Sequence, residues 1–193
     1  MLIGISGKIG TGKTTLADCL EELWPSQRIY RTAFASPLKS EAAETYNFPL
    51  ELCYSQRGKE QVIFHPDLPS QSMSVRQILQ WHGQMRRDAD PDYWVKAMRL
   101  DLCSLVGRDT IIIDDVRYPN ESALIHERGG LTVRLNPYPD WRPGPHSGHI
   151  SETALDSHEF DLEYLPFFGE LKAVAVDIAH ALEFAAAMAE GYE

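Results

Sequence analysis

The first residues that suggest chemistry are the glycines, the lysine and the threonine between Gly7 and Thr14. This segment fits the phosphate-binding pattern G-x-x-x-x-G-K-[ST] at every fixed position. Glycine lets the backbone of such a loop turn successive N–H groups toward a phosphate. Lys13 can reach the β- and γ-phosphates, and the Thr14 hydroxyl can ligate Mg²⁺. The segment therefore predicts a site for a nucleoside triphosphate.

The residues on either side of this loop predict the secondary structure that such a site requires. Residues 2–6 form a short, mostly apolar run that is typical of a buried strand. After the loop, one helical stripe contains Leu16, Leu20, Leu23 and Trp24. A helix that begins near Lys13 would add the positive end of its dipole to the phosphate site. A chance glycine-rich turn is the weaker interpretation of this segment.

A second buried strand is predicted at residues 110–113, and it ends in two carboxylates, Asp114 and Asp115. Ligands of open α/β sheets bind at the carboxyl ends of the strands. Either acid could therefore act on Mg²⁺ or its water shell, and either could merely cap the next turn. Arg117 follows closely; it could contact a phosphate or pair with an acid at the surface.

A polar stripe is predicted on the helix that begins after Ser74, its expected N-cap. The apolar face of this helix consists of Val75, Ile78, Leu79 and Met85. The other face, within ~60° of rotation, carries Arg76, Gln80, Gly83 and Arg87. Arginine forks match phosphate, glutamine can read a base edge, and glycine permits close approach. The stripe fits an anionic ligand along the helix, although an ordinary solvated face has the same pattern.

Two further segments carry candidate phosphate contacts. A strand is predicted from residue 28 to 34, followed by a helix with Ser36 as N-cap and Pro37 at its first position. Lys39 in that first turn could contact an acceptor phosphate or be a plain surface lysine. Residues 136–149 hold four prolines and no periodic pattern, which predicts a long loop. This loop is either a lid that closes Arg142 over the phosphates or a plain surface loop.

Composition and charge narrow the class of protein. The 193 residues suffice for one domain, and no apolar run approaches the ~20 residues of a membrane span. Three scattered cysteines and the absence of a signal-like N-terminus favour a cytoplasmic protein without disulfides. The net charge of −10 disfavours binding to nucleic acid polymers. Residues 1–100 nevertheless hold 12 basic against 11 acidic side chains, which favours a local site for a small anion.

Several motifs in the same order resemble the bacteriophage-type deoxynucleoside monophosphate kinases, a branch of the P-loop nucleoside monophosphate kinase group. They are GKIGTGKTT, FASPLK, RQILQWHGQMRR with DPDYW close behind, IIDDVRYPNE and HISETALD, and together they extend over most of the chain. The resemblance implies phosphorylation of a deoxynucleoside 5′-monophosphate by Mg·ATP, in the host cytoplasm if the protein is phage-encoded.

The resemblance also implies a set of site residues. ATP would be bound by Gly10, Thr11, Gly12, Lys13, Thr14 and Thr15. The monophosphate would be bound by Lys39, Arg76, Gln80 and Arg87, with Arg142 as the lid contribution. Lys13, Asp115 and Arg117 would be catalytic, and Thr14 and Asp115 would face the metal. The chain departs from the pattern at Asp114, where the family often has a small or neutral residue, and in its Gly/Pro/His-rich lid.

The sequence therefore predicts an α/β protein with the three-layer P-loop kinase fold, a parallel sheet of about five strands flanked by helices. The chain is expected to be a single domain with an acceptor-binding segment at about 36–95 and a lid at about 136–150; a homodimer is left open. Three rival functions remain: a kinase of another small acceptor such as dephospho-coenzyme A, a kinase of modified bases in DNA, and a non-catalytic nucleotide-binding regulator.

Overall fold

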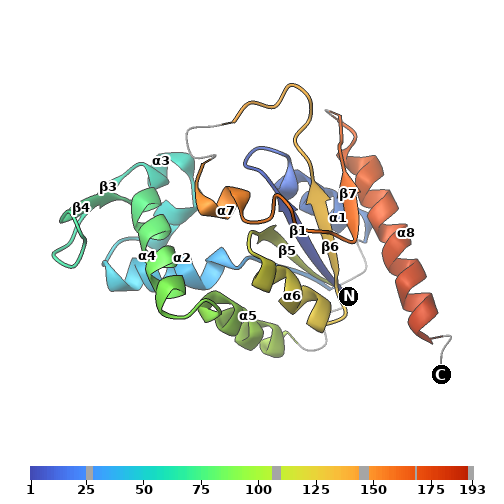
Figure 1. The fold of residues 1–193 in the computed structure, drawn as a ribbon, viewed down its shortest axis with the longest axis horizontal. Helices are drawn as coiled ribbons and strands as arrows, with labels where there is room; N and C mark the ends of the chain where they lie inside the picture. Colours follow the sequence, from blue (N-terminus) through green and yellow to red (C-terminus); the bar gives the residue numbers. More distant parts are fainter. Residues whose placement is uncertain (25–27, 106–109, 144–147, 168, 191–193) are drawn as a thin grey trace. The chain divides into compact units, whose positions relative to one another are not determined.

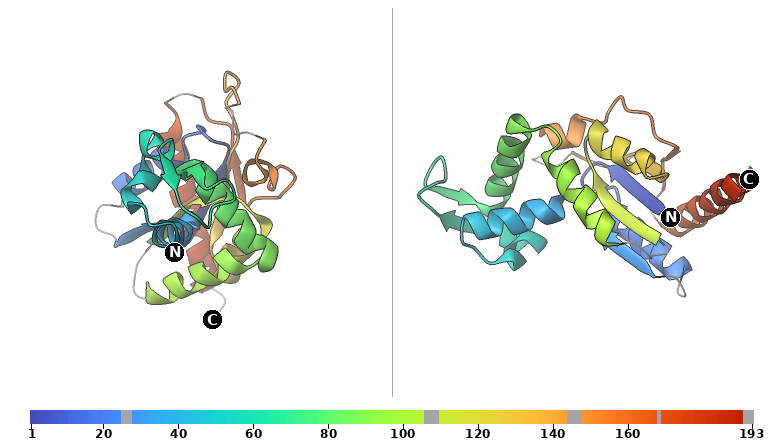
Figure 2. Two further views of the ribbon diagram at one scale, coloured as in Figure 1. Left: turned by 90° about the vertical axis from the view of Figure 1, so that its left-hand side faces the viewer. Right: turned by 90° about the horizontal axis from the view of Figure 1, so that it is seen from below.

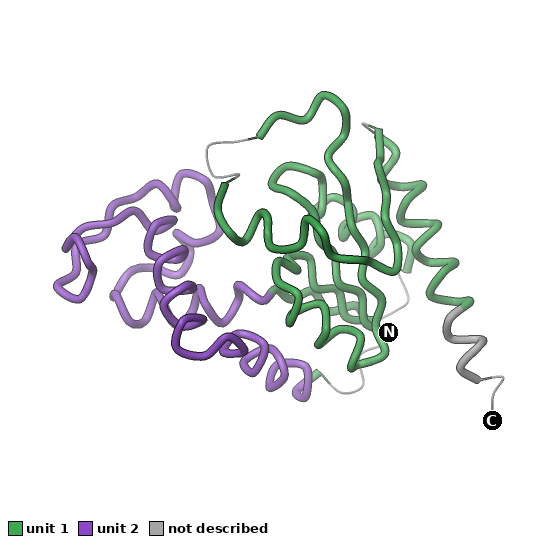
Figure 3. Tube along the Cα trace, viewed as in Figure 1, with its two compact units in different colours: residues 1–33, 105–193 green, residues 34–104 purple. Residues whose placement is uncertain are grey.

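The chain divides into two compact units in the computed structural model (Figure 3). The structure describes residues 1–24, 28–105, 110–143, 148–167 and 169–190. Unit 1 consists of residues 1–33 and 105–193, and unit 2 consists of residues 34–104. The predicted acceptor-binding segment at 36–95 falls within unit 2. That the whole chain works as a single kinase domain stays a prediction.

Unit 1 is built on a five-stranded parallel sheet (Figure 1). Its strands, in chain order, are β1 (Leu2–Gly7), β2 (Ile29–Thr32), β5 (Thr110–Val116), β6 (Leu131–Leu135) and β7 (Leu162–Tyr164). In space their order is β2-β5-β1-β6-β7. The helices of this unit are α1 (Lys13–Leu23), α6 (Pro119–Glu127), α7 (Ile150–Thr153) and α8 (Leu171–Glu190). The predicted fold class, a parallel sheet of about five strands flanked by helices, is confirmed.

Side-chain alternation along β1 divides the apolar residues between the two faces of the sheet. Ile3 and Ile5 are fully buried in a core cluster with Leu16 of α1 and Ile178 of α8. Gly4, between them, faces α6: a Cβ atom at Gly4 would lie 2.0 Å from Cδ1 of Ile125. The sheet is thus a middle layer between α6 on one face and α1 with α8 on the other (Figure 2).

The topology of unit 1 explains where a ligand can bind. β1 and β5 are neighbours, but β1 leads into α1 on one face of the sheet and β5 leads into α6 on the other. Ligands of open α/β sheets bind at the carboxyl ends of two such strands, where the connections diverge. The glycine-rich loop follows β1, and the two aspartates lie near the end of β5, so the fold brings both predicted groups to this point.

Unit 2 is mainly helical. Its elements are α2 (Ala35–Thr45), the 3₁₀ helix η1 (Leu50–Tyr54), α3 (Gln56–Lys59), the antiparallel strands β3 (Val62–Phe64) and β4 (Ser72–Ser74), α4 (Val75–Ala89) and α5 (Tyr93–Ser104). Ser74 caps α4 as predicted, with a reciprocal capping box in which Gln77 is the partner. Val75 and Ile78 of α4 are fully buried in a core with residues of α2 and η1.

Two details of the predicted helices are wrong. α2 begins at Ala35 after Phe34, so Ser36 is not its N-cap. Pro37 then lies at the third position of the helix, where a missing N–H costs nothing because the first-turn amides have no intrahelical partner. In α4, Met85 is exposed, whereas His82 and Gly83 are buried.

None of the helices in the described part of the chain combines the length and apolar character needed to cross a bilayer.

The contact between Gly4 and α6 provides a test of the layer arrangement. Gly4→Ala should lower the free energy of unfolding by about 1–3 kcal/mol, because the new methyl group overlaps Cδ1 of Ile125. Ile125→Val removes that atom and should restore part of the loss in the double variant. Gly148→Ala is the matched control, since a Cβ atom there would have no neighbour within 4 Å. Urea denaturation measures all three variants; an unchanged midpoint for Gly4→Ala would contradict this packing.

Candidate phosphate-binding site

The loop between β1 and α1 has the backbone of a phosphate cradle. Gly10 and Gly12 adopt positive φ angles of 80° and 92°, which residues with side chains rarely adopt. Gly12 also lacks room for a side chain, because its Cβ would lie 2.8 Å from Cδ1 of Leu171. Gly12 is the N-cap of α1, and no side chain caps this helix. The start of α1, with the positive end of its dipole, is thus available to an anion.

Lys13 directs its ammonium group back into this loop. Nζ donates hydrogen bonds to the carbonyl oxygens of Gly7 and Lys8, each at 2.8 Å. The pKa of Lys13 is lowered from 10.5 to about 7, chiefly by burial and also by the nearby charge of Arg117; the charges of Glu152, Asp115 and Asp114 oppose the shift. The structure therefore brings Lys13, Arg117 and both aspartates within electrostatic range of one another.

An irregularity in β5 separates the roles of the two aspartates. Gly4 of β1 pairs with Ile113, but Ser6 pairs with Val116, so Asp114 and Asp115 together oppose the single residue Ile5. This is a β-bulge, which interrupts side-chain alternation and re-aims side chains. Asp114 accepts a hydrogen bond from Nη2 of Arg31 at 3.0 Å. Its carboxylate is thereby engaged in an ion pair with Arg31 of β2, whereas the charge of Asp115 acts on Lys13 more strongly than that of Asp114 does, so Asp115 is the better candidate for the metal.

The oxygen donors at this site fit a magnesium ion. The hydroxyl of Thr14, which is exposed, and the carboxylate of Asp115 are hard ligands of the kind that Mg²⁺ prefers. Within the described ranges, no group of three His, Cys, Asp or Glu side chains is placed to hold a metal ion. Mg²⁺ usually keeps several waters and is held by one or two protein groups plus substrate phosphates. Thr14 and Asp115 suit this kind of site.

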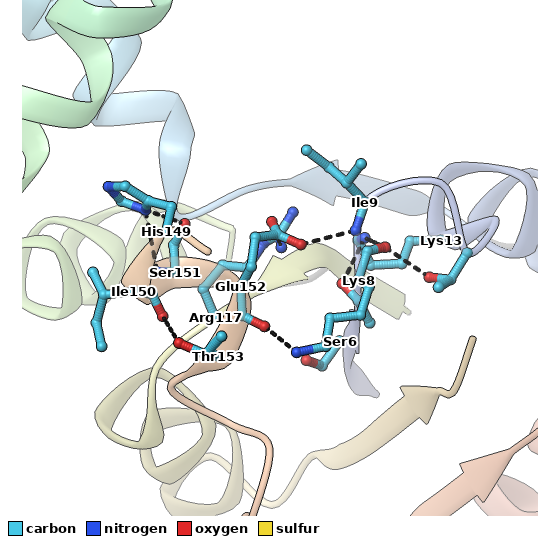
Figure 4. A network of polar contacts seen from close by, with 12 residues as sticks. Ser6, Lys8, Ile9, Lys13, Arg117, His149, Ile150, Ser151, Glu152 and Thr153 are labelled. Carbon is cyan, nitrogen blue, oxygen red and sulfur yellow. Dashed lines mark hydrogen bonds and ion pairs between the residues drawn. The ribbon is translucent and has the colours of Figure 1, made fainter. Parts of the chain in front are cut away.

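Glu152 of α7 links Arg117 to the phosphate loop (Figure 4). Its Oε1 forms an ion pair with Nη1 of Arg117, and its Oε2 accepts a hydrogen bond of 2.9 Å from the backbone N–H of Ile9. Only 5% of the Glu152 side chain is exposed. Glu152 belongs to the motif HISETALD, but the residue pattern of this motif does not indicate its partners.

A second basic group lies beside this contact. Arg134 of β6 donates hydrogen bonds to Oγ of Ser6 at 3.0 Å and to Oδ1 of Asp156 at 3.3 Å. Lys8 pairs with the same Asp156 carboxylate and with the backbone carbonyl of Glu152. A small pocket there is lined by Ser6, Gly7, Val116, Arg117, Arg134, Ser151, Glu152 and Leu155. The carboxyl ends of β1, β5 and β6 thus surround a recess in which Arg117 and Arg134 lie beside the carboxylate of Glu152.

The loop predicted as a lid contacts the phosphate loop through a different residue from the one expected. Nε1 of Trp141 donates a hydrogen bond of 2.8 Å to the carbonyl oxygen of Ile9. Arg142 is exposed and donates to the carbonyl oxygen of Trp141 at 3.1 Å. Its role over the phosphates stays a prediction. Part of the predicted lid, residues 144–147, lies outside the described residues.

The predicted acceptor residues lie in unit 2. Arg76 donates to Oε1 of Glu60 at 3.1 Å and to Oε1 of Gln56 at 2.6 Å. Arg87 donates to the carbonyl oxygen of Gly83 at 3.4 Å, and Gln80 is partly exposed. Lys39 lies over the ring of Tyr54, with Nζ 4.7 Å from the ring centre.

Gly83 does not belong to the exposed face, contrary to the expectation. It is buried: its carbonyl oxygen accepts a hydrogen bond of 3.2 Å from Nε1 of Trp94, and its Cβ would lie 3.2 Å from Cδ2 of Leu38. Close packing within unit 2, rather than approach of a ligand, explains the glycine.

The chain is similar in sequence to a viral protein and, at low identity, to solved structures of two shikimate kinases. No protein-family model matches the sequence. A protein of Acanthamoeba polyphaga mimivirus, named "Putative deoxynucleotide monophosphate kinase", is 29% identical over 171 residues, which are 81% of this chain and 83% of the viral protein. Among solved structures, the shikimate kinase of Aquifex aeolicus is 14% identical with a TM-score of 0.47, over 96% of this chain and 98% of its own. The shikimate kinase of Acinetobacter baumannii is 11% identical with a TM-score of 0.46, over 94% and 92%.

The lowered pKa of Lys13 predicts that nucleotide binding takes up a proton. At pH 8, a lysine with a pKa of about 7 is roughly 90% neutral in the free protein. Triphosphate oxygens favour the charged ammonium and raise this pKa, so ATP binding at pH 8 should take up close to one proton. Affinity should fall as pH rises above 7. Calorimetry in buffers of different ionisation enthalpy measures the uptake; Lys13→Met should abolish it, and equal uptake by the variant would contradict the assignment.

Proposed function

We propose that this chain phosphorylates a deoxynucleoside 5′-monophosphate to the diphosphate, with Mg·ATP as donor. The observation that carries the proposal is the ammonium of Lys13, held within a glycine loop at the strand ends beside Arg117 and Asp115. The 29% identity to the mimivirus protein supports a deoxynucleotide as acceptor. The acceptor would be bound by the predicted residues of unit 2, Lys39, Arg76, Gln80 and Arg87.

The roles of the residues follow from the charge that develops during phosphoryl transfer. The γ-phosphoryl group carries negative charge on three oxygens as it moves between two oxygens in line. The loop amides, Lys13 and Arg117 would stabilise this charge. Mg²⁺, when bound, neutralises charge on the phosphates, and Thr14 and Asp115 would hold it. The acceptor phosphate is anionic near pH 7, so no general base and no covalent protein intermediate are needed.

The Glu152–Arg117 contact supports this assignment further. Without an anionic partner, the guanidinium of Arg117 would sample several rotamers. The ion pair with Glu152 instead holds it beside the loop. Binding energy is therefore not needed to order this side chain when substrates arrive. Glu152 is a positioning residue in this proposal, because it acts through Arg117 and the Ile9 amide.

An acceptor panel tests the reaction. ADP formation from Mg·ATP should occur with at least one common deoxynucleoside monophosphate and not with dephospho-coenzyme A or single-stranded DNA. Lys13→Ala should lower kcat by about a hundredfold or more, because it removes the charge that the loop presents to the transferred group. Turnover with dephospho-coenzyme A alone, with DNA alone or with no acceptor would contradict the proposal and favour the corresponding rival.

The two aspartates of the bulge should give different phenotypes. Asp115→Asn should lower kcat by about a hundredfold and raise the Mg²⁺ concentration needed for half-maximal rate. Asp114→Asn should chiefly weaken the ion pair with Arg31, with a loss of about 1 kcal/mol in the free energy of unfolding and little change in kcat. Each variant serves as the control of the other. The reverse pattern would assign the metal to Asp114.

A further inference from the structure

Three cationic side chains of unit 2 gather around the short helix α3. Lys39 belongs to α2, Lys59 to α3 and Arg76 to α4. The charges of Lys39 and Arg76 both lower the pKa of Lys59, and burial of its side chain lowers it more strongly. Contacts place the three groups around α3: Arg76 donates to Gln56, the first residue of α3, and pairs with Glu60, next to Lys59, while Lys39 lies over the ring of Tyr54, two residues before α3.

Among the described residues, these three cations are paired with fewer carboxylates than there are positive charges. Glu60 pairs with Arg76 at 3.1 Å, and Gln56 contributes a neutral oxygen to the same guanidinium. Lys39 has the ring of Tyr54 beneath its ammonium. The backbone N–H of Lys59 donates to the carbonyl oxygen of Ser55, but its ammonium group forms no hydrogen bond or ion pair with any residue in the part of the chain that the structure describes. Three positive charges thus share a single carboxylate.

Such an arrangement is costly unless it receives an anion. A partly buried ammonium beside two like charges is destabilised by desolvation and by repulsion. An exposed lysine avoids this cost because its tip reaches water, but Lys59 is only partly exposed. A bound anion reduces both costs, because it replaces the water that the Lys59 ammonium has lost and offsets the repulsion among the three cations.

We propose that Lys59 completes an anion site with Lys39 and Arg76, and that this site binds the phosphate monoester of the acceptor. The inference rests on the proposed function only in taking a nucleotide as the ligand. Lys59 lies on a short helix outside the polar stripe of α4. The spacing that indicated Arg76 therefore could not indicate Lys59.

The residues suit a terminal phosphate better than a diester or a carboxylate. A monoester near pH 7 carries close to two negative charges and three accepting oxygens. Arg76 offers a planar fork, and the two lysines offer compact charges that approach from other helices. Glu60, which pairs with Arg76 in the free protein, would share or release that guanidinium when the phosphate binds.

A set of charge variants tests this site. Lys59→Gln removes the charge with little change in volume, Lys59→Arg keeps it, and Arg57→Gln removes an exposed charge from the same helix as the matched control. The probes are inorganic phosphate, the four common deoxynucleoside monophosphates and the matching deoxynucleosides, each titrated calorimetrically without ATP at low ionic strength. Circular dichroism confirms that each variant is folded.

We expect Lys59→Gln to weaken monophosphate binding by about ten- to a hundredfold, the range of one charged hydrogen bond. Deoxynucleoside binding should not change, and Lys59→Arg and Arg57→Gln should remain near the wild type. In the kinase assay, the KM for the monophosphate should rise by the same factor, with kcat and the KM for ATP nearly unchanged.

The outcomes separate this inference from the proposed function. If Lys59→Gln binds monophosphate and inorganic phosphate as the wild type does, or if the wild type binds neither, the anion site is wrong. If the wild type phosphorylates no deoxynucleotide but still binds phosphate through Lys59, the site stands and the proposed reaction is wrong. If turnover occurs and Lys59→Gln keeps the wild-type KM, the reaction stands and the site is wrong.

Discussion

An ammonium group enclosed by its own backbone is the interaction on which unit 1 depends. Two carbonyl oxygens and three carboxylates compensate Lys13 only in part, so burial still shifts its pKa to about 7. Three neighbouring features lie beside it: glycines with positive φ angles, a helix start without a side-chain cap and an arginine held close by Glu152. Together they form a recess that is better stabilised with an anion than without one.

Local patterns made the loop, the sheet and α4 predictable from the sequence. The spacing of the glycines and Lys13 is enough to predict the conformation of the loop. Ser74 and Gln77 form a helix cap within one turn, so this cap is also visible in the local sequence. Glu152 was not predictable, because its partners Ile9 and Arg117 are 143 and 35 residues away. The four residues of α7 contain no pattern that indicates a contact with Ile9 or Arg117. Helical spacing likewise placed Gly83 on the polar face, but Trp94 and Leu38 bury it through packing between helices.

Unit 2 shows why a helical stripe alone is a weak guide to a binding surface. Periodicity reports which residues of one helix share a face, yet it contains no information about what other helices bring there. Lys39, Lys59 and Arg76 come from three different helices. Glu60 and Gln56, which pair with Arg76, lie on or beside the shortest of them. The electrostatic character of this region is therefore a property of the fold of residues 34–104.

The extra residue in β5 has a consequence for the whole edge of the sheet. Ile112 packs in the core with α1 and α8, whereas Val116, four positions later, lies 3.1 Å from the Cβ position of Gly4 on the side of α6. In a regular strand these two residues would have the same parity and share one face. Because the bulge makes Asp114 and Asp115 count as one position, Val116 instead lies on the face opposite to Ile112. The number of residues in this strand, as well as their identity, thus decides which side chains meet the loop.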